Sequence, residues 1–253
     1  MHHNLAGKPV PPDMLVNLPR LVSLYYATQP DYEQPEQRVV FGTSGHRGSS
    51  LNGSFTESHI LAITQAVCDY RRQAGIDGPL FPGMDTHALS EPAHSSALCV
   101  LAANGIQTRI ARDHDFTPTP VVSHTILGYN RGRKEGLADG IVITPSHNPP
   151  EDGGIKYNPT HGGPAESAMT KWIASAANVY LKNGNADVKR VGLAQAVAAD
   201  CVQEYDYRTP YIADLDAIID MTAIRRAGIR IGADALGGAG INYWRAIAEC
   251  YGL

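Results

Sequence analysis

The chain has 253 residues, which suits one large domain or two small ones and is ample for a buried core. Its 21 Lys and Arg against 25 Asp and Glu give a formal net charge of −4, which argues against a nucleic-acid partner because such a protein needs a basic face. An apolar fraction of 43% excludes wholesale disorder, and no apolar run approaches the roughly 18 residues of a membrane span.

The four cysteines and the N-terminal residues bear on the cellular compartment. Cys68, Cys99, Cys201 and Cys250 are scattered and form no CxxC pair, which is typical of reduced, mostly buried thiols rather than of a disulfide framework. Residues 1–12 contain no apolar stretch of the kind found in signal peptides. We therefore expect a cytoplasmic protein with no membrane partner.

Short apolar runs alternate with turns and helical patterns through the first two hundred or so residues. Strands are predicted at 39–41, 80–84, 106–110 and 140–144, and helices at 57–72, 91–104, 117–128 and 164–182. Ser54 and Glu57 fit a capping box for the first of these helices. The branched run Ile141, Val142, Ile143 is typical of a strand buried on both faces. This alternation predicts a layered α/β/α domain with a mainly parallel mixed sheet.

Residues 206–210 resemble a linker, which divides the chain into a domain at 1–206 and a second unit at 207–253. The second unit is expected to hold a helical stretch from Leu215 to Ile224, a strand at 229–233, and a helix over 241–251 after the glycine-rich turn at 236–240. A unit this small rarely buries its own apolar faces. The pattern thus indicates the beginning of a second, similar domain, and a chain that is incomplete or needs a partner.

The densest polar cluster directly follows the buried strand and reads Thr144-Pro-Ser-His-Asn-Pro-Pro150, then Glu151-Asp-Gly-Gly-Ile-Lys-Tyr-Asn158. In open α/β sheets, ligands bind beyond the carboxyl ends of the strands. Prolines and paired glycines hold a tight turn that can present the Ser146 hydroxyl, with His147, Asn148 and Lys156 nearby in sequence. The alternative is a plain turn whose side chains bond their own backbone, but the combination favours a functional loop.

A second cluster, Phe41-Gly-Thr-Ser-Gly-His-Arg-Gly48, combines glycines, small hydroxyls and the planar guanidinium of Arg47, which suits phosphate oxygens. It lacks the endings of a P-loop or a dinucleotide fingerprint, and a structural turn before a helix is equally compatible with it. In a third cluster, Gly83-Met-Asp-Thr-His-Ala-Leu-Ser90, Asp85 and Thr86 are interpreted mainly as helix caps.

Two other site classes are disfavoured. The ten histidines include no HExxH pattern, which argues against a protein zinc site. Neither Ser44 nor Ser146 lies in a GxSxG setting, which argues against an acyl hydrolase.

Taken together, the segments at 41–48, 144–149 and 154–158 resemble those of the α-D-phosphohexomutase superfamily, and within it the bacterial enzymes specific for α-D-glucose phosphates. Residues 83–87, 116–120 and 236–240 fit the same family. The resemblance implies the reversible conversion of glucose 1-phosphate into glucose 6-phosphate by an intramolecular phosphotransferase of the isomerase class. It also implies a phosphoserine, a glucose 1,6-bisphosphate intermediate and activator, and Mg²⁺ as cofactor.

Carried over by motif, the resemblance makes Ser146 the phosphorylated residue and, through its phosphate, a Mg²⁺ ligand. His147 is implied as an acid/base group, and Lys156 and Arg47 as its cationic partners in the catalytic site. Four further residues are implied to bind substrate or phosphate: Thr43, Ser44, His46 and Asn148. Cations around one hydroxyl are the expected equipment for phosphoryl transfer, which depends on positioning and charge neutralisation.

The sequence departs from the family pattern in length. The family has four domains, and its Asp-rich metal loop of the D-x-D-x-D-R type does not occur in these residues. We therefore expect that the Asp ligands of the metal and the C-terminal domains are missing partners, and that the isolated chain has little or no activity. The alternative is a catalytically incomplete fragment that binds a sugar phosphate or another protein.

Overall fold

The core of the chain is a mixed sheet with the strand order β1-β5-β4-β2-β3-β6. The computed structural model describes residues 4–42 and 45–253. Within them the strands are β1 (Gly45–Ser49), β2 (Leu80–Met84), β3 (Thr108–Ala111), β4 (Asp139–Ile143), β5 (Asp152–Asn158) and β6 (Val202–Tyr205). Strands β2, β3, β4 and β6 run parallel, and β5 is antiparallel to both β4 and β1. The predicted mainly parallel mixed sheet is confirmed.

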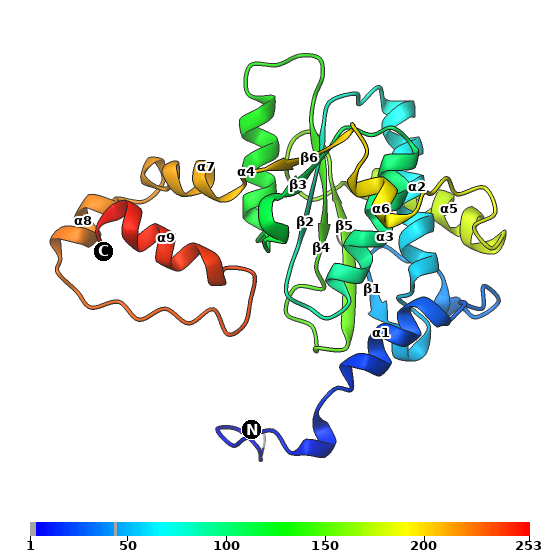
Figure 1. Cartoon of the computed structure of the whole chain (residues 1–253), viewed down its shortest axis with the longest axis horizontal. Coiled ribbons are helices and arrows are strands. Elements are labelled where there is room, and N and C mark those ends of the chain that lie inside the picture. The colour runs from blue at the N-terminus through cyan, green and yellow to red at the C-terminus, as the bar shows by residue number, and fades with distance from the viewer. Residues whose placement is uncertain (1–3, 43–44) are drawn as a thin grey trace.

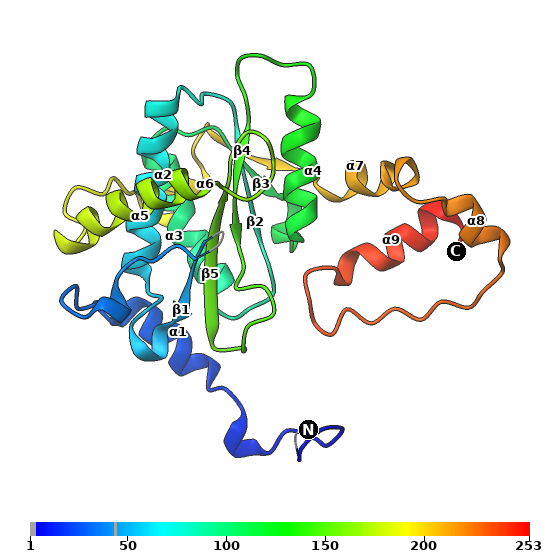
Figure 2. The same cartoon turned by 180° about the vertical axis from the view of Figure 1, so that it is seen from behind.

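Helices cover both faces of this sheet (Figures 1 and 2). The longer ones of the sheet domain are α1 (Leu18–Ala27), α2 (Glu57–Ala74), α3 (Ser90–Ala103), α4 (Thr119–Asn130) and α5 (Ser167–Lys182), with the short α6 at Leu193–Val197. Single 3-10 turns lie at Pro12–Met14, Pro35–Gln37, Ser50–Asn52, Arg112–His114 and Leu215–Ala217. The layered α/β/α architecture predicted from the alternation is therefore present.

The core divides into two layers because successive strand residues point to opposite faces. Ile141 and Ile143 of β4 pack in the large cluster formed with α2, α3 and α5, whereas Val142 packs with α4. All five residues of β4 are buried. The branched run predicted as a doubly buried strand is confirmed, and it places the loop after Ile143 at the carboxyl edge of the sheet.

Several predicted boundaries are confirmed and some are wrong. Strand β2 matches its prediction, and α3 ends at the expected Asn104–Gly105 stop. The capping box at the start of α2 is formed by Thr56 and His59 rather than by Ser54 and Glu57. Helix α4 continues through Gly128 to Asn130.

The predicted strand at 39–41 is also wrong. This segment makes only an isolated bridge between Phe41 and His46, and β1 begins at Gly45. Its strand partner is β5, more than a hundred residues later in the chain, so no local pattern near residue 40 could place the strand.

Residues 206–210 are not a linker. Tyr207 is 4% exposed, and its hydroxyl lies 3.0 Å from the carbonyl oxygen of Pro82 and 2.6 Å from that of Arg109. Its ring packs edge-on against Phe81. Helix α7 begins directly afterwards, at Arg208. The boundary between residues 1–206 and 207–253 stays a prediction.

The last part of the chain extends from one side of the sheet domain and consists of α7 (Arg208–Ala213), α8 (Met221–Arg226) and α9 (Ile241–Tyr251) (Figure 1). The predicted strand at 229–233 is wrong: this segment has no strand neighbour among the described residues, and Ile229 and Ile231 are 63% and 53% exposed. These two side chains line an apolar groove of about 560 Å³ between α4, α7, α8 and α9. The expectation of incompletely buried apolar faces is met.

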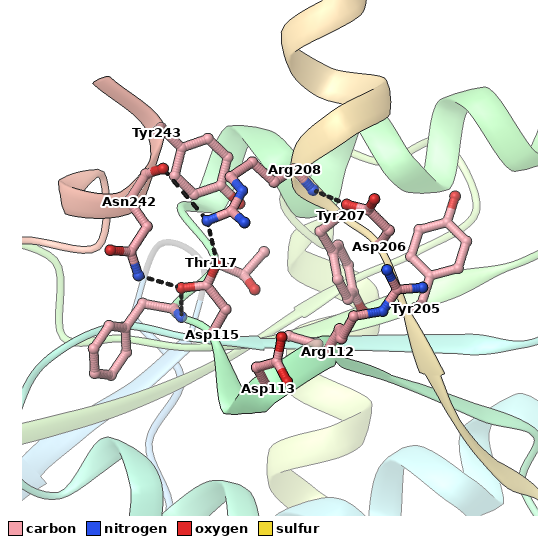
Figure 3. A pocket seen from close by; sticks show the side chains of 12 residues that line it. Arg112, Asp113, Asp115, Thr117, Tyr205, Asp206, Tyr207, Arg208, Asn242 and Tyr243 are labelled. Atoms are coloured by element: carbon pink, nitrogen blue, oxygen red, sulfur yellow. Dashed lines mark hydrogen bonds and ion pairs between the residues drawn. The ribbon is translucent and has the colours of Figure 1, made fainter. Parts of the chain in front are cut away.

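A polar pocket joins this last part to the carboxyl edge of the sheet. Figure 3 shows the Asp115 carboxylate between Arg208 and Asn242. Asp115 Oδ2 accepts a hydrogen bond from Arg208 Nη1 at 3.2 Å, and Oδ1 accepts one from Asn242 Nδ2 at 2.6 Å. One carboxylate thus fixes the beginnings of α7 and α9 to the sheet domain.

The remaining expectations about the compartment concern cysteines and membranes. All four cysteines are free thiols, as expected, although only Cys68 is fully buried. No helix in the described part of the chain has the length and apolar character needed to cross a bilayer.

Candidate functional site

The antiparallel pair β1 and β5 brings two cations to one face of the sheet. Arg47 pairs in register with Gly154, and Lys156 pairs with Gly45. Directly paired residues of antiparallel strands lie on the same face, and so do residues two apart on one strand. Each long cationic side chain therefore faces a glycine, which leaves room for both to extend toward the loop after β4.

The Ser146 hydroxyl lies where these two cations converge. Lys156 Nζ donates to Ser146 Oγ at 2.8 Å, and Arg47 Nη2 donates to the same oxygen at 3.5 Å. The serine is exposed to solvent. The structure thus brings together three of the four catalytic residues expected from the sequence.

Ser146 adopts a left-handed backbone conformation, with φ of 71°. Such a conformation is unfavourable for a residue with a Cβ, at about 1 kcal/mol or more. The Ser146 N–H donates to Thr144 Oγ1 at 2.8 Å, and the Asn148 side-chain amide donates to Asp152 Oδ2 at 3.0 Å. Neighbouring side chains therefore hold the loop in the shape that turns the hydroxyl outward.

The site is electrostatically prepared for an anion. The pKa of Lys156 is lowered, first by burial of its ammonium group and then by repulsion from Arg47, while Asp85 acts in the opposite direction. Phosphoserine carries roughly −1.5 to −2 charges at neutral pH. A phosphoryl group on Ser146 would relieve the repulsion between the two cations.

The other expected site residues are placed differently. His147 is exposed, and its ring makes no hydrogen bond within the described residues. The Asn148 side chain is engaged with Asp152, although it remains at the edge of the site. Thr43 and Ser44 lie outside the described residues.

His46 does not reach the site. Its ring is buried, with Nε2 2.8 Å from the carbonyl oxygen of Ser54, while the Val40 backbone N–H donates to Nδ1 at 3.3 Å. Burial lowers the pKa of the ring, and the hydrogen bond to Ser54 opposes the effect without reversing it. The ring also stacks on His59. The expectation that His46 binds phosphate does not fit this interior position.

The sequence interpretation treated the third cluster, residues 83–90, mainly as helix caps and did not assign it to the site. Asp85 and His87 follow β2, and His87 Nε2 lies 3.2 Å from the carbonyl oxygen of Asn148. Asp85 does cap the turn, since its carboxylate accepts from the His87 backbone N–H at 3.0 Å. The available signal was the position of both residues at the carboxyl end of a parallel strand next to β4.

Replacement of Gly154 with alanine is expected to displace residues 144–151, the loop between β4 and β5 that carries Ser146 (the serine loop). A Cβ at this position would lie 2.4 Å from the Thr144 carbonyl oxygen and 2.8 Å from the Pro145 Cα, which are both backbone atoms at the base of the loop. Overpacking of this kind costs about 1–3 kcal/mol. The melting temperature should fall for Gly154→Ala. It should not fall for Gly192→Ala, because a Cβ at residue 192 has no neighbouring atom within 4 Å. Equal melting temperatures for the two variants would show that the backbone of Thr144 and Pro145 can move aside without loss of stability.

The residues around Ser146 do not by themselves form a site for Mg²⁺, the metal that the family resemblance implies. Mg²⁺ prefers near-octahedral oxygen ligation that includes carboxylates. The groups nearest to Ser146 Oγ are cations, and no three His, Cys, Asp or Glu side chains converge anywhere in the described ranges 4–42 and 45–253.

Comparison with known proteins gives consistent matches. The family model for phosphoglucomutase/phosphomannomutase, alpha/beta/alpha domain I, matches residues 38–183. A phosphoglucomutase of Komagataeibacter xylinus is 58% identical over 248 residues, which cover 98% of this chain and 45% of that protein. Phosphoglucomutase 1 of Saccharomyces cerevisiae is 31% identical, over 73% of this chain and 33% of that protein.

A solved structure supports the fold. The chain superimposes on the open form of parafusin, a phosphoglucomutase from Paramecium, with a TM-score of 0.70 and 21% identity, covering 88% of this chain and 42% of that one. The chain thus spans less than half the length of the relatives it matches.

Proposed function

We propose that this chain, which belongs to the phosphoglucomutase/phosphomannomutase family, is the phosphoserine-bearing part of a phosphoglucomutase. The proposed enzyme interconverts α-D-glucose 1-phosphate and glucose 6-phosphate through glucose 1,6-bisphosphate. The observation that carries the proposal is the convergence of Lys156 Nζ and Arg47 Nη2 on Ser146 Oγ. Preference for glucose over other hexoses rests on the similarity to the Komagataeibacter xylinus protein.

The proposed chemistry is a phosphoryl exchange at Ser146. A sugar hydroxyl oxygen forms a bond to phosphorus as the bond from phosphorus to Ser146 Oγ breaks. The sugar loses one proton, and the serine oxygen regains one. The bisphosphorylated sugar then turns in the site and returns its other phosphoryl group by the reverse step.

The residues of this chain have separate roles in that exchange. Lys156 and Arg47 neutralise the charge on the transferring group and hold it in line, which is the main requirement of phosphoryl transfer. His147 is the proposed acid/base group, because its ring is exposed beside Ser146 and an imidazole has one nitrogen that can donate a proton and one that can accept one. Thr43, Ser44 and Asn148 are proposed to bind phosphate or sugar at the rim.

Two further components are proposed to come from outside these residues. Mg²⁺ is proposed to bind the phosphate on Ser146 together with carboxylates that this chain does not supply, and when bound it would neutralise phosphate charge. The C-terminal domains found in longer relatives are proposed to cover the groove between α4 and α9, whose lining is almost entirely apolar. The compartment is proposed to be the cytoplasm.

A second candidate function is a sugar-phosphate-binding or interaction fragment without turnover. The same open groove favours it, because an uncovered apolar surface around a volume of about 560 Å³ is available to a partner. The two functions differ in whether covalent phosphoryl transfer takes place at Ser146.

Mass spectrometry tests the proposal directly. The purified chain is incubated with glucose 1,6-bisphosphate and Mg²⁺, alone and together with the C-terminal portion of the Komagataeibacter xylinus protein. We expect one phosphoryl group on the peptide that contains Ser146, and sugar-phosphate interconversion only in the assembled protein. Binding of sugar phosphate without any label on Ser146 in the assembled protein favours the second function. Labelling of Ser146 by a fluorophosphonate would contradict both, because it indicates an acyl hydrolase.

A further inference from the structure

We infer that Asp85 and His87 form a positioning pair that holds the serine loop in place through the backbone of Asn148. The inference deepens the proposed function, because the loop held in this way carries Ser146. The pair does not touch Ser146 and is assigned no catalytic step. Its role is to fix where the Ser146 hydroxyl lies relative to Lys156 and Arg47.

The first part of the argument is that Asp85 is itself firmly held. Its backbone N–H donates to the carbonyl oxygen of Ile143, the last residue of β4, at 3.0 Å. Its Oδ1 accepts from the Ser90 hydroxyl at 2.5 Å and from the His87 N–H at 3.0 Å. Asp85 is therefore tied to the strand that leads into the serine loop and to the helix that follows its own loop.

The second part concerns the orientation of the His87 ring. Its Nδ1 lies 2.9 Å from Asp85 Oδ2, so the carboxylate fixes this nitrogen as a donor. The opposite nitrogen, Nε2, faces the Asn148 carbonyl oxygen at 3.2 Å, and a carbonyl oxygen only accepts, so both contacts are hydrogen bonds in the imidazolium form of the ring, which carries a proton on each nitrogen. The ring thus connects the partly buried Asp85 carboxylate to the serine loop, as carboxylate–histidine pairs orient functional groups elsewhere.

The third part is that the serine loop needs a contact from outside its own segment, such as the one from His87 to Asn148. Ser146 holds a left-handed conformation that its own side chain does not favour, and the loop from Ser146 to Pro150 is largely exposed. The local ties come from Thr144 and Asp152, both within the same segment of chain. His87 adds a tie from a different strand, 61 residues away in sequence. A displacement of about 1 Å can cost phosphoryl transfer on the order of a hundredfold.

Hydrogen exchange followed by mass spectrometry tests the inference on the chain itself. The variants are His87→Ala, His87→Gln and Asp85→Asn, with His161→Ala as a control because His161 is an exposed loop histidine whose ring accepts a hydrogen bond from the Gly163 N–H, outside the serine loop. We expect the backbone amides of residues 146–148, 151 and 152 to exchange about tenfold faster in His87→Ala, as follows from loss of a hydrogen bond to a charged or polarised donor. The exchange rates of the β4 amides should be unchanged, and this result would exclude global unfolding as the cause.

The conservative variants separate positioning from general damage. The side-chain amide that His87→Gln introduces can still donate to the Asn148 carbonyl, so this variant should recover part of the protection. Asp85→Asn and His87→Ala should combine non-additively, because both break one chain of contacts. Unchanged exchange over 146–152 in all three variants would overturn the inference.

A second readout connects the pair to the proposed function while keeping the two apart. The rate of phosphoryl transfer from glucose 1,6-bisphosphate to Ser146 should fall about a hundredfold in His87→Ala, with little change in the bisphosphate concentration that gives half the maximal rate. If the wild-type chain and its assembled form take no phosphoryl group but the loop loosens as expected, the proposed function fails and the positioning role stands. If transfer occurs and His87→Ala leaves its rate unchanged, the positioning role fails alone.

Discussion

Removal of the Ser146 hydroxyl is expected to abolish phosphoryl transfer in the assembled enzyme. Loss of a covalent nucleophile reduces turnover by factors above about 10⁴, and the two cations on Ser146 Oγ cannot replace the acceptor oxygen. We therefore expect no measurable interconversion of glucose 1-phosphate and glucose 6-phosphate by Ser146→Ala. The coupled assay for glucose 6-phosphate measures this loss.

A glycine variant separates the hydroxyl from the loop conformation. Because φ at residue 146 is 71°, Ser146→Gly removes the same oxygen but relaxes the backbone, whereas alanine keeps the unfavourable Cβ. Both variants should be inactive, and the glycine variant should melt at or above the wild-type temperature. Ser175→Ala, on the exposed surface of α5, should retain full activity. Full activity in either variant of Ser146 would remove the basis of the proposed mechanism.

Replacement of Arg71 with alanine is expected to cause the largest loss of stability. Arg71 is 2% exposed and forms an ion pair at 3.3 Å with Asp139, which is 0% exposed. The second oxygen of Asp139 accepts from the Tyr157 hydroxyl at 2.6 Å. Removal of one partner leaves a buried charge uncompensated, which costs about 3–5 kcal/mol. Denaturant unfolding should show this loss in the free energy of unfolding.

The neighbouring arginine provides a matched control. Arg72 is 65% exposed and pairs with Asp69 at the surface, so Arg72→Ala should change the free energy of unfolding by about 1 kcal/mol or less. Equal losses for Arg71→Ala and Arg72→Ala would show that burial of the pair has no energetic consequence.

The pH dependence of the same network follows from Asp139. Burial raises the pKa of this carboxyl to about 6, and Arg71 opposes the shift. Since this value lies above the unfolded value of about 3.9, the folded state takes up the proton first. Its contribution to stability is complete below about pH 4 and is lost as the pH rises through about 6. The difference in unfolding free energy between wild type and Asp139→Asn, measured across this range, should follow that course, and a difference that is flat with pH would contradict it.

Local patterns in the amino-acid sequence were sufficient to place the elements whose signals lie within a few residues. The unbroken apolar run of β4, the Asn104–Gly105 stop of α3 and the helix after the glycine-rich turn at 236–240 all depend on residues within one turn or one strand of each other. The serine loop could also be located, because Pro and Gly restrict its backbone and the strand before it is easily recognised. Membership of the family followed from the same short segments.

Placements that depend on contacts between distant segments emerged only from the folded chain. Strand β1 forms at Gly45–Ser49 because β5 lies beside it, and His46 points inward because its ring forms hydrogen bonds with the backbone of Val40 and Ser54. Tyr207 is buried because Phe81 lies opposite, although its neighbours in sequence resemble a linker. The contact from His87 to Asn148 likewise joins two loops whose strands are adjacent only in the sheet. Local sequence carries conformational preference, whereas these placements follow from packing and hydrogen bonding across the sheet.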